Sequence, residues 1–217
     1  ENETSSQVEN TSVAFQNILH EMRTPLTLIM SPLEDEYQKE KNKNLSIALK
    51  NSRRLYHLTN QLLDIHRASS INYYIKLYPV NIVNFIVRCS ELFAPTALKR
   101  NVPFLLTING SKIDLSQPLK NVLVILADKD SLEKIIFNYL SNALKFCNGK
   151  TIELAIVEES EKIKISVKDQ GDGIKKGDQS EIFNIYRQVS EEDKGKGFGI
   201  GLSLVKRLTE KMNGEYG

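Results

Sequence analysis

His20 and Glu21 are adjacent, and an imidazole beside a carboxylate can do nucleophilic and acid–base chemistry. A neutral ring nitrogen can attack an electrophile, while the carboxylate accepts a hydrogen bond from the other ring nitrogen and then takes its proton. Thr24 lies one helical turn beyond Glu21, where its hydroxyl could align a water molecule. The alternative is that His20 is an ordinary solvated residue, and that Thr24 only bonds a backbone carbonyl ahead of Pro25.

A second set of polar residues, Asn138, Asn142 and Lys145, falls at positions i, i+4 and i+7 of a predicted helix, on one face. Two carboxamides and an ammonium group in a row suit a hydrated magnesium ion and phosphate oxygens. Asparagine is a poor helix former, so two of them within a helix indicate a role beyond helix formation. The alternative is a solvated helix face.

A third set, Asp169, Gly171 and Gly173, follows a predicted strand. The strand alternates, and Asp169 continues the parity of its apolar side chains, which predicts that the carboxylate points toward the covered face of the sheet. A carboxylate there can accept a hydrogen bond from an exocyclic amine, and the glycines would let a flat ring approach the backbone. The alternative is a simple turn.

The segment 195–202, Gly-Lys-Gly-Phe-Gly-Ile-Gly-Leu, leads into a predicted helix. Glycine-rich backbone before a helix N-terminus is typical of an anion site, because backbone N–H groups and the helix dipole point at the phosphate. The segment has a lysine, but not at the position that a P-loop requires, and no strand directly precedes it as a dinucleotide fold requires. Shortly before it, Phe183 and Arg187 bring an aromatic ring and a cation into a polar stretch.

The elements that must position His20 are two predicted helices. Apolar residues at alternating steps of three and four form a seam to about residue 36: Val8, Phe15, Leu19, Met22, Leu26, Ile29 and Leu33. Pro25 should kink this helix. After a charged loop at 38–44, a second seam comprises Ala48, Leu55, Leu58, Leu62 and Ile65. A lone hairpin cannot bury both seams, so the pattern predicts a dimer that closes into a four-helix bundle.

From about residue 75 the pattern becomes mixed, after a boundary at 69–72. It predicts a strand at 78–80, a helix at 82–99 capped by Asn81, strands at 102–108 and 122–127, and a hairpin of strands at 151–157 and 162–168. The apolar run 122–127 is typical of a fully buried strand. Residues 130–133, Asp-Ser-Leu-Glu, have the form of a capping box that opens the helix bearing the asparagines.

Composition excludes several classes of protein. A hydrophobic share of 41%, a charged share of 26% and a net charge of +2 over 217 residues fit an ordinary globular protein, with no argument for binding nucleic acid. The sequence has no apolar run of membrane-spanning length and no signal peptide. Cys89 and Cys147 have no metal-binding spacing. Because the sequence starts at Glu1 without a methionine, we expect an upstream part.

Taken in order, these motifs resemble the catalytic core of sensor histidine kinases over nearly the whole chain. His-Glu-Met-Arg-Thr-Pro-Leu at 20–26 resembles the phosphoacceptor box. Residues 1–72 resemble the dimerisation and histidine phosphotransfer domain, and residues 75–217 a Bergerat-type ATP-binding domain, an α/β sandwich. The style of the boxes is similar to hybrid two-component sensors of Bacteroidetes. The family continues with further strand after the last helix, so we expect that the C-terminal edge of the sheet is truncated.

The resemblance implies ATP-dependent autophosphorylation of His20 and transfer to the aspartate of a response-regulator receiver, on another chain or a missing part of this one, with receiver phosphatase activity through Glu21 and Thr24. It implies a homodimer, and a cytoplasmic location for this domain within a membrane-anchored sensor. Asn138 and Asn142 would bind Mg2+ and phosphates. The implied ATP-binding residues are Asn138, Asn142, Lys145, Phe146, Asp169, Gly171, Gly173, Phe183, Arg187, Gly197, Phe198, Gly199, Gly201 and Leu202.

Three other functions compete with this one. A pseudokinase would keep ATP for shape and signal by conformation, although every motif position is filled. An ATPase of the gyrase or chaperone kind needs a glutamate that activates water on the magnesium helix, where this sequence has Asn138. A plain coiled-coil interaction protein leaves the glycine motifs unexplained.

Overall fold

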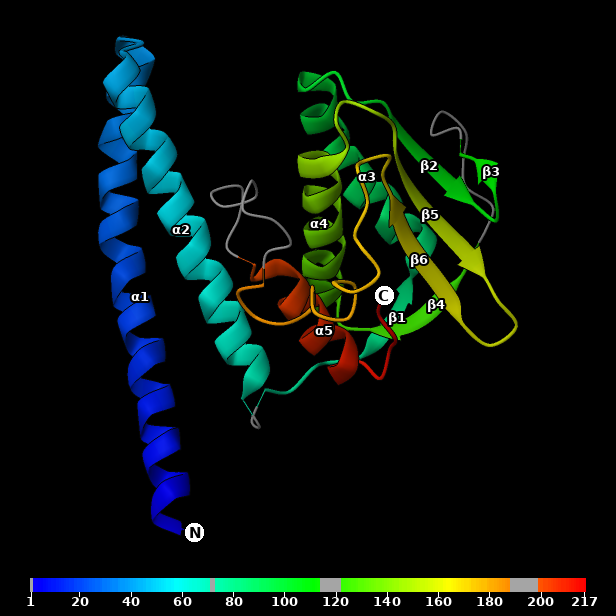
Figure 1. The fold of residues 1–217 in the computed structure, drawn as a ribbon, viewed down its shortest axis with the longest axis horizontal. Helices are drawn as coiled ribbons and strands as arrows, with labels where there is room; N and C mark the ends of the chain where they lie inside the picture. The colour runs from blue at the N-terminus through cyan, green and yellow to red at the C-terminus, as the bar shows by residue number, and fades with distance from the viewer. Residues whose placement is uncertain (1, 71–72, 114–121, 188–198) are drawn as a thin grey trace. The chain divides into compact units, whose positions relative to one another are not determined.

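The structure is a computed structural model that describes residues 2–70, 73–113, 122–187 and 199–217, with the backbone alone for residues 2–16. It divides into two compact units, Glu1–Tyr73 and Tyr74–Gly217. The first is a helical hairpin and the second an α/β sandwich (Figure 1), which confirms the predicted fold class. Within the described ranges, no helix is both long enough and apolar enough to cross a membrane.

The hairpin consists of α1 (Asn2–Lys39) and α2 (Lys43–Ser69), which run antiparallel. The α1 helix continues through Pro25 and Pro32 without ending at either. A short turn joins the helices, and Asn42 caps α2 by accepting a hydrogen bond from the backbone N–H of Asn44 at 2.8 Å. Along the hairpin, Nε and Nη2 of Arg53 both donate to Oε1 of Glu34, at 3.1 and 2.7 Å.

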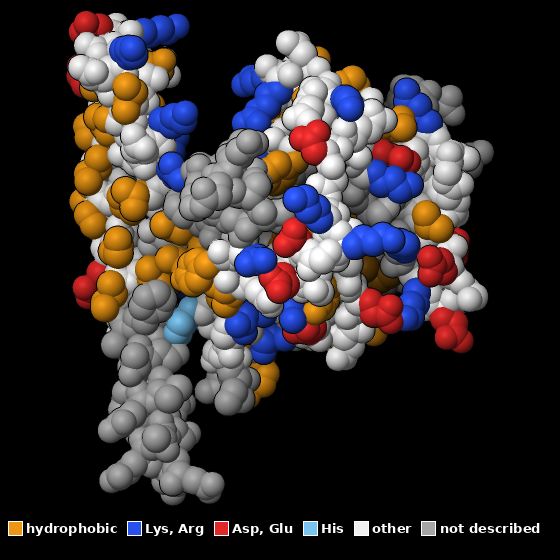
Figure 2. All heavy atoms as spheres, viewed as in Figure 1, with side chains coloured by type: hydrophobic (Ala, Val, Ile, Leu, Met, Phe, Trp, Pro, Cys, Tyr) orange, Lys and Arg blue, Asp and Glu red, His pale blue; other side chains and the backbone are white. Residues whose placement is uncertain are grey.

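The predicted seam of α1 divides between two environments. Leu19 and Leu26, one heptad apart, are buried within the hairpin, whereas Met22 is 41% and Ile29 49% exposed. On the predicted seam of α2, Ile65 is buried, whereas Leu55 is 44% exposed. The buried residues of α2 are Leu49, Thr59, Leu63, Ile65 and Ala68. One face of each helix therefore remains apolar and uncovered, as the hydrophobic side chains along the hairpin in Figure 2 illustrate.

The second unit contains two sheets. A two-stranded antiparallel sheet pairs β1 (Tyr78–Asn81) with β4 (Val124–Ala127). A four-stranded sheet has the order β3-β2-β5-β6, comprising β3 (Ser111–Lys112), β2 (Phe104–Ile108), β5 (Ile152–Glu158) and β6 (Ile163–Lys168). Strands β2 and β5 are parallel, and the other pairs are antiparallel. The predicted hairpin of strands is confirmed.

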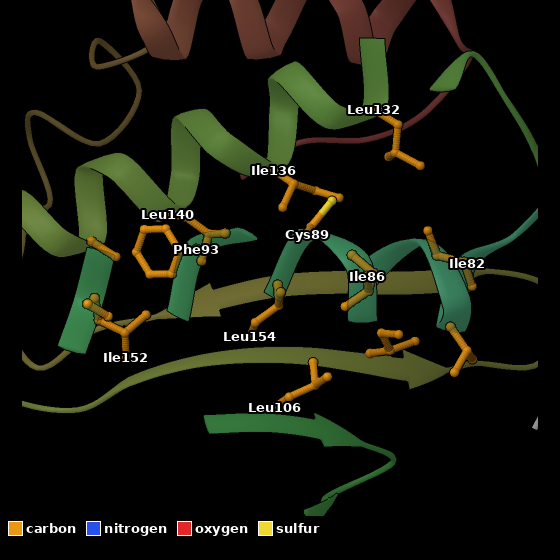
Figure 3. Packing of buried hydrophobic residues seen from close by; sticks show 14 of the residues in the cluster. Ile82, Ile86, Cys89, Phe93, Leu106, Leu132, Ile136, Leu140, Ile152 and Leu154 are labelled. Atoms are coloured by element: carbon orange, nitrogen blue, oxygen red, sulfur yellow. The ribbon is translucent and has the colours of Figure 1, made fainter. Parts of the chain in front are cut away.

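Helices α3 (Ile82–Lys99), α4 (Lys129–Phe146) and α5 (Gly201–Lys211) complete the sandwich. The core lies between the sheet and α3 and α4, and α5 packs against α4. In Figure 3, Ile136 and Leu140 of α4 point toward Cys89 and Phe93 of α3 and toward Leu154 of β5. Such fully buried side chains each stabilise the fold by roughly 1.5–3 kcal/mol relative to exposure. This core fixes α4, and with it the predicted asparagine stripe.

Two predictions about the approach to α4 were wrong. Strand β4 is not fully buried: Val124 is 55% and Leu126 64% exposed, because its sheet has only β1 beside it and only one face is covered. The N-cap of α4 is Asp128, whose Oδ1 accepts from the backbone N–H of Ser131 at 2.8 Å, rather than a capping box that starts at Asp130. The helix therefore begins one residue before the predicted box.

Candidate functional site

His20 lies on α1, next to the buried Leu19, and its ring is half-buried. The heptad seam explains this position, because the residue after a seam position flanks the packed surface. The ring borders a shallow, open hollow together with Arg23, Thr24, Thr27 and Leu28 of the same helix. A molecule in the hollow can therefore reach the edge of the imidazole.

Arg67, in the last turn of α2, contacts His20 directly: Nη2 of Arg67 lies 2.9 Å from Nε2 of His20. A guanidinium group can only donate hydrogen bonds, so Nε2 must be the acceptor and carries no proton. In the neutral ring the proton then resides on Nδ1. The contact therefore makes Nε2 the nitrogen with a lone pair, which is the form that a nucleophile needs.

Glu21 was predicted to bond the His20 ring, but in the described part of the chain the ring's hydrogen bond comes from Arg67, and Glu21 is exposed. Arg23 is oriented toward Tyr56 of α2. The pKa of Tyr56 is lowered below its usual value, first by a hydrogen bond from Asn60 and then by the neighbouring Arg23 guanidinium. Both arginine contacts join the face around His20 to α2, so the hairpin packing sets the geometry of the histidine.

Thr24 is exposed, and among the described residues its hydroxyl has no hydrogen-bond partner. The neighbouring Thr27 instead bonds the backbone one turn back, because its Oγ1 donates to the carbonyl of Arg23 at 3.0 Å. The alternative that we gave for Thr24, a bond to the backbone, is thus what Thr27 does in this structure. Thr24 borders the hollow beside His20.

On α4, the residues Asn138, Asn142 and Lys145 are half-buried and follow one another along the helix as predicted. Nδ2 of Asn138 donates to the carbonyl of Lys134 at 2.7 Å, which leaves Oδ1 as the end of the amide that can bind a cation. The ammonium of Lys145 lies over the ring of Phe146, 4.3 Å from its centroid. The stripe therefore presents oxygen and ammonium groups along a single line.

The Asp169 turn approaches the C-terminal end of α4. Oδ1 of Asp169 accepts from the backbone N–H of Gly171 at 2.8 Å, and a Cβ on Gly171 would stand 2.3 Å from the carbonyl oxygen of Phe146. Glycine is therefore obligatory at Gly171 for steric reasons. Gly173 has φ of +75°, which favours glycine, and open space around it. Asp169 itself is exposed, so the prediction from strand alternation that its carboxylate is covered was wrong.

The N-terminus of α5 approaches the same helix further along. A Cβ on Gly201 would lie 2.4 Å from Oδ1 of Asn138, so only glycine lets the first turn of α5 come this close to the asparagine. Leu202 is half-buried in that turn. Gly199, at φ of +67°, accepts a hydrogen bond from the backbone N–H of Tyr186 at 2.9 Å. The predicted residues Gly197 and Phe198 lie outside the described residues.

Phe183 and Arg187 lie in the segment before this glycine region, and both are engaged with neighbours. The ring of Phe183 contacts the ring of Tyr216, with centroids 4.8 Å apart. Nη2 of Arg187 is 2.6 Å from Oε2 of Glu181 and 3.4 Å from Oδ1 of Asp178. In this conformation Arg187 is thus held within its own loop, and the predicted contact with a nucleotide would require it to turn.

The structure therefore brings the predicted residues of the sandwich together on α4. Gly171 meets this helix at Phe146 and Gly201 meets it at Asn138, eight residues or about 12 Å apart along the axis. Asn142 and Lys145 lie between these two approaches. A carboxylate and a glycine cradle at one end, with oxygen ligands and a helix N-terminus at the other, suit a base followed by phosphates.

Two contacts of the site were missed by sequence reasoning. Nδ2 of Asn148 donates to Oδ1 of Asp172 at 3.1 Å and ties the end of α4 to the Asp169 turn. Arg67 was missed because its partner lies 47 residues away in sequence. The register of the hairpin, which only the structure reveals, accounts for Arg67: His20 lies fourteen residues before Glu34, and Arg67 fourteen residues after Arg53.

Comparison with known proteins gives the same division. Residues 12–71 match the family model described as "His Kinase A (phospho-acceptor) domain", and residues 127–216 match "Histidine kinase-, DNA gyrase B-, and HSP90-like ATPase". The chain is 30% identical to Histidine kinase P4 of Formosa agariphila and 32% identical to Hybrid signal transduction histidine kinase D of Dictyostelium discoideum. Each alignment covers 92% of this chain, but only 15% and 13% of the two relatives.

Solved structures, histidine kinases among them, have a similar fold. Full-length ShkA in complex with AMPPNP matches with a TM-score of 0.72 and 25% identity, over 92% of this chain and 41% of that one. The fold of ThkA in complex with the response regulator protein TrrA also matches, at 17% identity and a TM-score of 0.61, over 98% of this chain and 55% of that one. Because both domain models match in order around His20 and the α4 stripe, the chain belongs to the histidine kinases and comprises their phospho-acceptor and ATPase domains.

Proposed function

We propose that this chain transfers the γ-phosphoryl group of ATP to its own His20 and then passes it to an aspartate of a response-regulator receiver in two-component signalling. The observation that carries the proposal is the setting of His20: its ring borders an open hollow, and its Nε2 lies 2.9 Å from Nη2 of Arg67, in the domain that matches the phospho-acceptor model. The matched ATPase domain in the same chain supplies a phosphoryl donor.

The transfer to His20 forms one bond to the γ-phosphorus and breaks another. The lone pair of Nε2 of His20 forms a bond to the γ-phosphorus, and the bond from that phosphorus to the bridging oxygen breaks, so the electron pair leaves with ADP. The ring then carries a positive charge and loses its Nδ1 proton to Glu21, which is exposed and adjacent in sequence. In the second step, an aspartate oxygen of the receiver attacks the phosphorus, and the imidazole is the leaving group.

In the sandwich, we infer that Asp169 accepts a hydrogen bond from the adenine amine, with Gly171 and Gly173 leaving room for the ring. Asn138 and Asn142 offer amide oxygens for Mg2+, and Oδ1 of Asn138, which accepts no hydrogen bond from the described residues, fits this donor set. When bound, Mg2+ offsets negative charge on the phosphates. Lys145 binds phosphate oxygens, and the segment with Gly197, Phe198, Gly199, Gly201 and Leu202 covers them.

We further infer that the chain works as a homodimer and that its acceptor is a receiver domain. Support for the dimer comes from the exposed Met22 and Ile29 on α1 and Leu55 on α2, an apolar surface that a second hairpin would cover. The receiver belongs to another chain or to another part of the same protein, as the word "hybrid" in one relative's name suggests. Other relatives are named sensor proteins, and we infer that this chain is the cytoplasmic domain of a membrane-anchored sensor.

Incubation with ATP labelled on the γ-phosphate tests the proposal. We expect a labelled protein whose label is lost in acid and stable in base, as a phosphoramidate is, and we expect no label in His20→Gln. Labelled ATP that binds to the protein without transferring its label would favour the pseudokinase. Release of free phosphate by both the parent and His20→Gln, without protein labelling, would favour a plain ATPase.

A further inference from the structure

We propose that Arg67 is a positioning residue for the phosphoryl transfer proposed above. In the resting hairpin it selects the tautomer of His20, and after transfer its guanidinium group binds the phosphoryl oxygens on Nε2. The proposal rests on the proposed function for its second half only, because the tautomer is a property of the protein without nucleotide. Its basis is the 2.9 Å contact between Nη2 of Arg67 and Nε2 of His20.

The contact follows from the packing of the two helices. His20 and Glu34 are fourteen residues apart on α1, and Arg53 and Arg67 are fourteen apart on α2. Fourteen residues are two heptads, so each pair returns to within about 40° of the same helix face. A single antiparallel register therefore produces both the Arg53–Glu34 bonds and the Arg67–His20 bond. Arg67 is placed by the hairpin as a whole.

The tautomer follows from the chemistry of the donor. An imidazole free in water exchanges its proton between Nδ1 and Nε2. Arg67 offers only N–H donors, so its bond is compatible with an unprotonated Nε2 alone and holds the proton on Nδ1. That tautomer directs the lone pair outward from Nε2 and leaves the Nδ1 proton available to Glu21 once the ring becomes charged.

The contact between Arg67 and the transferred phosphoryl group follows from the place that this group takes on His20. A group bonded to Nε2 occupies the space from which the Arg67 hydrogen bond came, so the guanidinium group must move aside by the reach of its side chain. Arg67 is exposed and sits in the last turn of α2, where its side chain can swing. A guanidinium group beside a phosphoryl group forms charge-assisted, often bidentate, hydrogen bonds. The same residue thus serves the acceptor before and after transfer.

The first test uses the full chain with 15N-labelled histidine and no nucleotide, in buffer of about pH 8.5, where imidazoles are neutral. The chain has three histidines, and the signals that vanish in His20→Gln belong to His20. We expect the parent to show a single Nδ1–H tautomer for His20 and Arg67→Leu to show averaged tautomers, with partial recovery in Arg67→Lys. A His20 spectrum unchanged in Arg67→Leu would overturn the proposal.

The matched control is Arg53→Leu, which removes an arginine contact between the same two helices, fourteen residues from Arg67, without touching His20. We expect its His20 signals to match those of the parent. If Arg53→Leu averages the tautomers as much as Arg67→Leu does, the role of Arg67 is only to hold the hairpin together.

The second test measures the fraction of phosphorylated protein at a fixed ratio of ATP to ADP. We expect the equilibrium constant for phosphorylation to fall about fivefold in Arg67→Leu, since one exposed charge pair is lost, and to stay unchanged in Arg53→Leu. An equal constant in Arg67→Leu would remove the phosphoryl contact. If the parent itself takes up no label, the proposed function fails, whereas the tautomer experiment still decides the role of Arg67.

Discussion

The two units of this protein bury their apolar side chains to different extents. In the sandwich, α3, α4 and the sheet enclose Ile86, Leu140 and Leu154 almost completely. In the hairpin, Leu19 and Leu26 are buried, while the alternate seam residues of α1 stay exposed. The sandwich thus encloses a core of its own, whereas the hairpin leaves an apolar surface that the proposed dimer would cover. The comparison predicts that substitutions act on chemistry and assembly in the hairpin, and on folding and nucleotide affinity in the sandwich.

The largest effect that separates the units should come from His20→Gln. We expect autophosphorylation to disappear and ATP affinity to remain within about twofold of the parent, because the proposed acceptor lies on the hairpin and the proposed nucleotide-binding residues lie on the sandwich. Labelling with γ-labelled ATP measures the first property and calorimetry the second. Equal labelling of this variant would remove His20 from the mechanism.

Assembly should be broken most sharply by Ile29→Glu. A carboxylate in the middle of the exposed seam would be buried without a partner in a four-helix bundle, at a cost of several kcal/mol. We expect the variant to sediment as a monomer at micromolar concentration where the parent is a dimer. Lys50, which is also exposed but polar, provides the control: Lys50→Glu should leave the dimer intact. A parent protein that is already monomeric at this concentration would contradict the bundle.

The free energy of unfolding should change most with a substitution in the core of the sandwich. Leu140 is fully buried between α4 and the sheet, so Leu140→Ala removes apolar contacts and leaves a cavity. We expect a loss of about 2–5 kcal/mol in the free energy of unfolding of the sandwich, measured by urea titration. Ile29→Ala removes a similar group from an exposed position. In the monomer it should cost less than about 0.5 kcal/mol, as other surface substitutions do.

Nucleotide affinity should depend on Asp169. An asparagine at this position can present its NH2 group, rather than an acceptor, to the adenine amine. We expect Asp169→Asn to weaken ATP binding about tenfold, roughly 1.5 kcal/mol, with the melting temperature of the free protein nearly unchanged because Asp169 is exposed. The exposed Glu159, in the loop between β5 and β6, supplies the control: Glu159→Gln should leave the affinity for ATP unchanged. An unchanged affinity in Asp169→Asn would mean that Asp169 only forms the turn with Gly171.

The difference between the units also explains what the sequence could predict. Local patterns identified the helices and strands, including α3 from Ile82 to Lys99, because caps and periodicity are properties of neighbouring residues. The exposure of Val124 and Leu126 on β4 could not be predicted, because it depends on which strand pairs with β4. An apolar run is the same in a covered strand and in an edge ribbon.

The candidate site also contains features that the sequence could predict and features that it could not. The stripe on α4 could be predicted from spacing alone, since a single helix fixes it. Arg67 could not, because its contact with His20 requires the register between two helices. Gly201 was predicted as part of the glycine-rich ATP-binding segment, and the structure adds a steric reason for glycine, the close approach to Asn138. Tertiary contacts of this kind require the packing to be known.

The smallest effect concerns the reverse reaction, the loss of phosphate from the receiver. The Thr24 hydroxyl is exposed one helical turn beyond Glu21, and it borders the hollow beside His20. From there it could hold a water molecule in line with the phosphoaspartate without acting as a base. We expect Thr24→Ala to keep autophosphorylation of His20 and to slow the decay of labelled receiver, measured with ADP present, by about tenfold or less, since one neutral hydrogen bond contributes about 0.5–1.5 kcal/mol.

Thr27 provides the matched control for this comparison within one helix. It borders the same hollow, but its hydroxyl bonds the carbonyl of Arg23. We therefore expect Thr27→Ala to change helix stability slightly and receiver decay not at all. If Thr24→Ala accelerates receiver decay as well as the parent does, the Thr24 hydroxyl has no part in the phosphatase reaction. If Thr24→Ala also loses autophosphorylation, the helix geometry around Pro25 is what matters, and the hydroxyl is incidental.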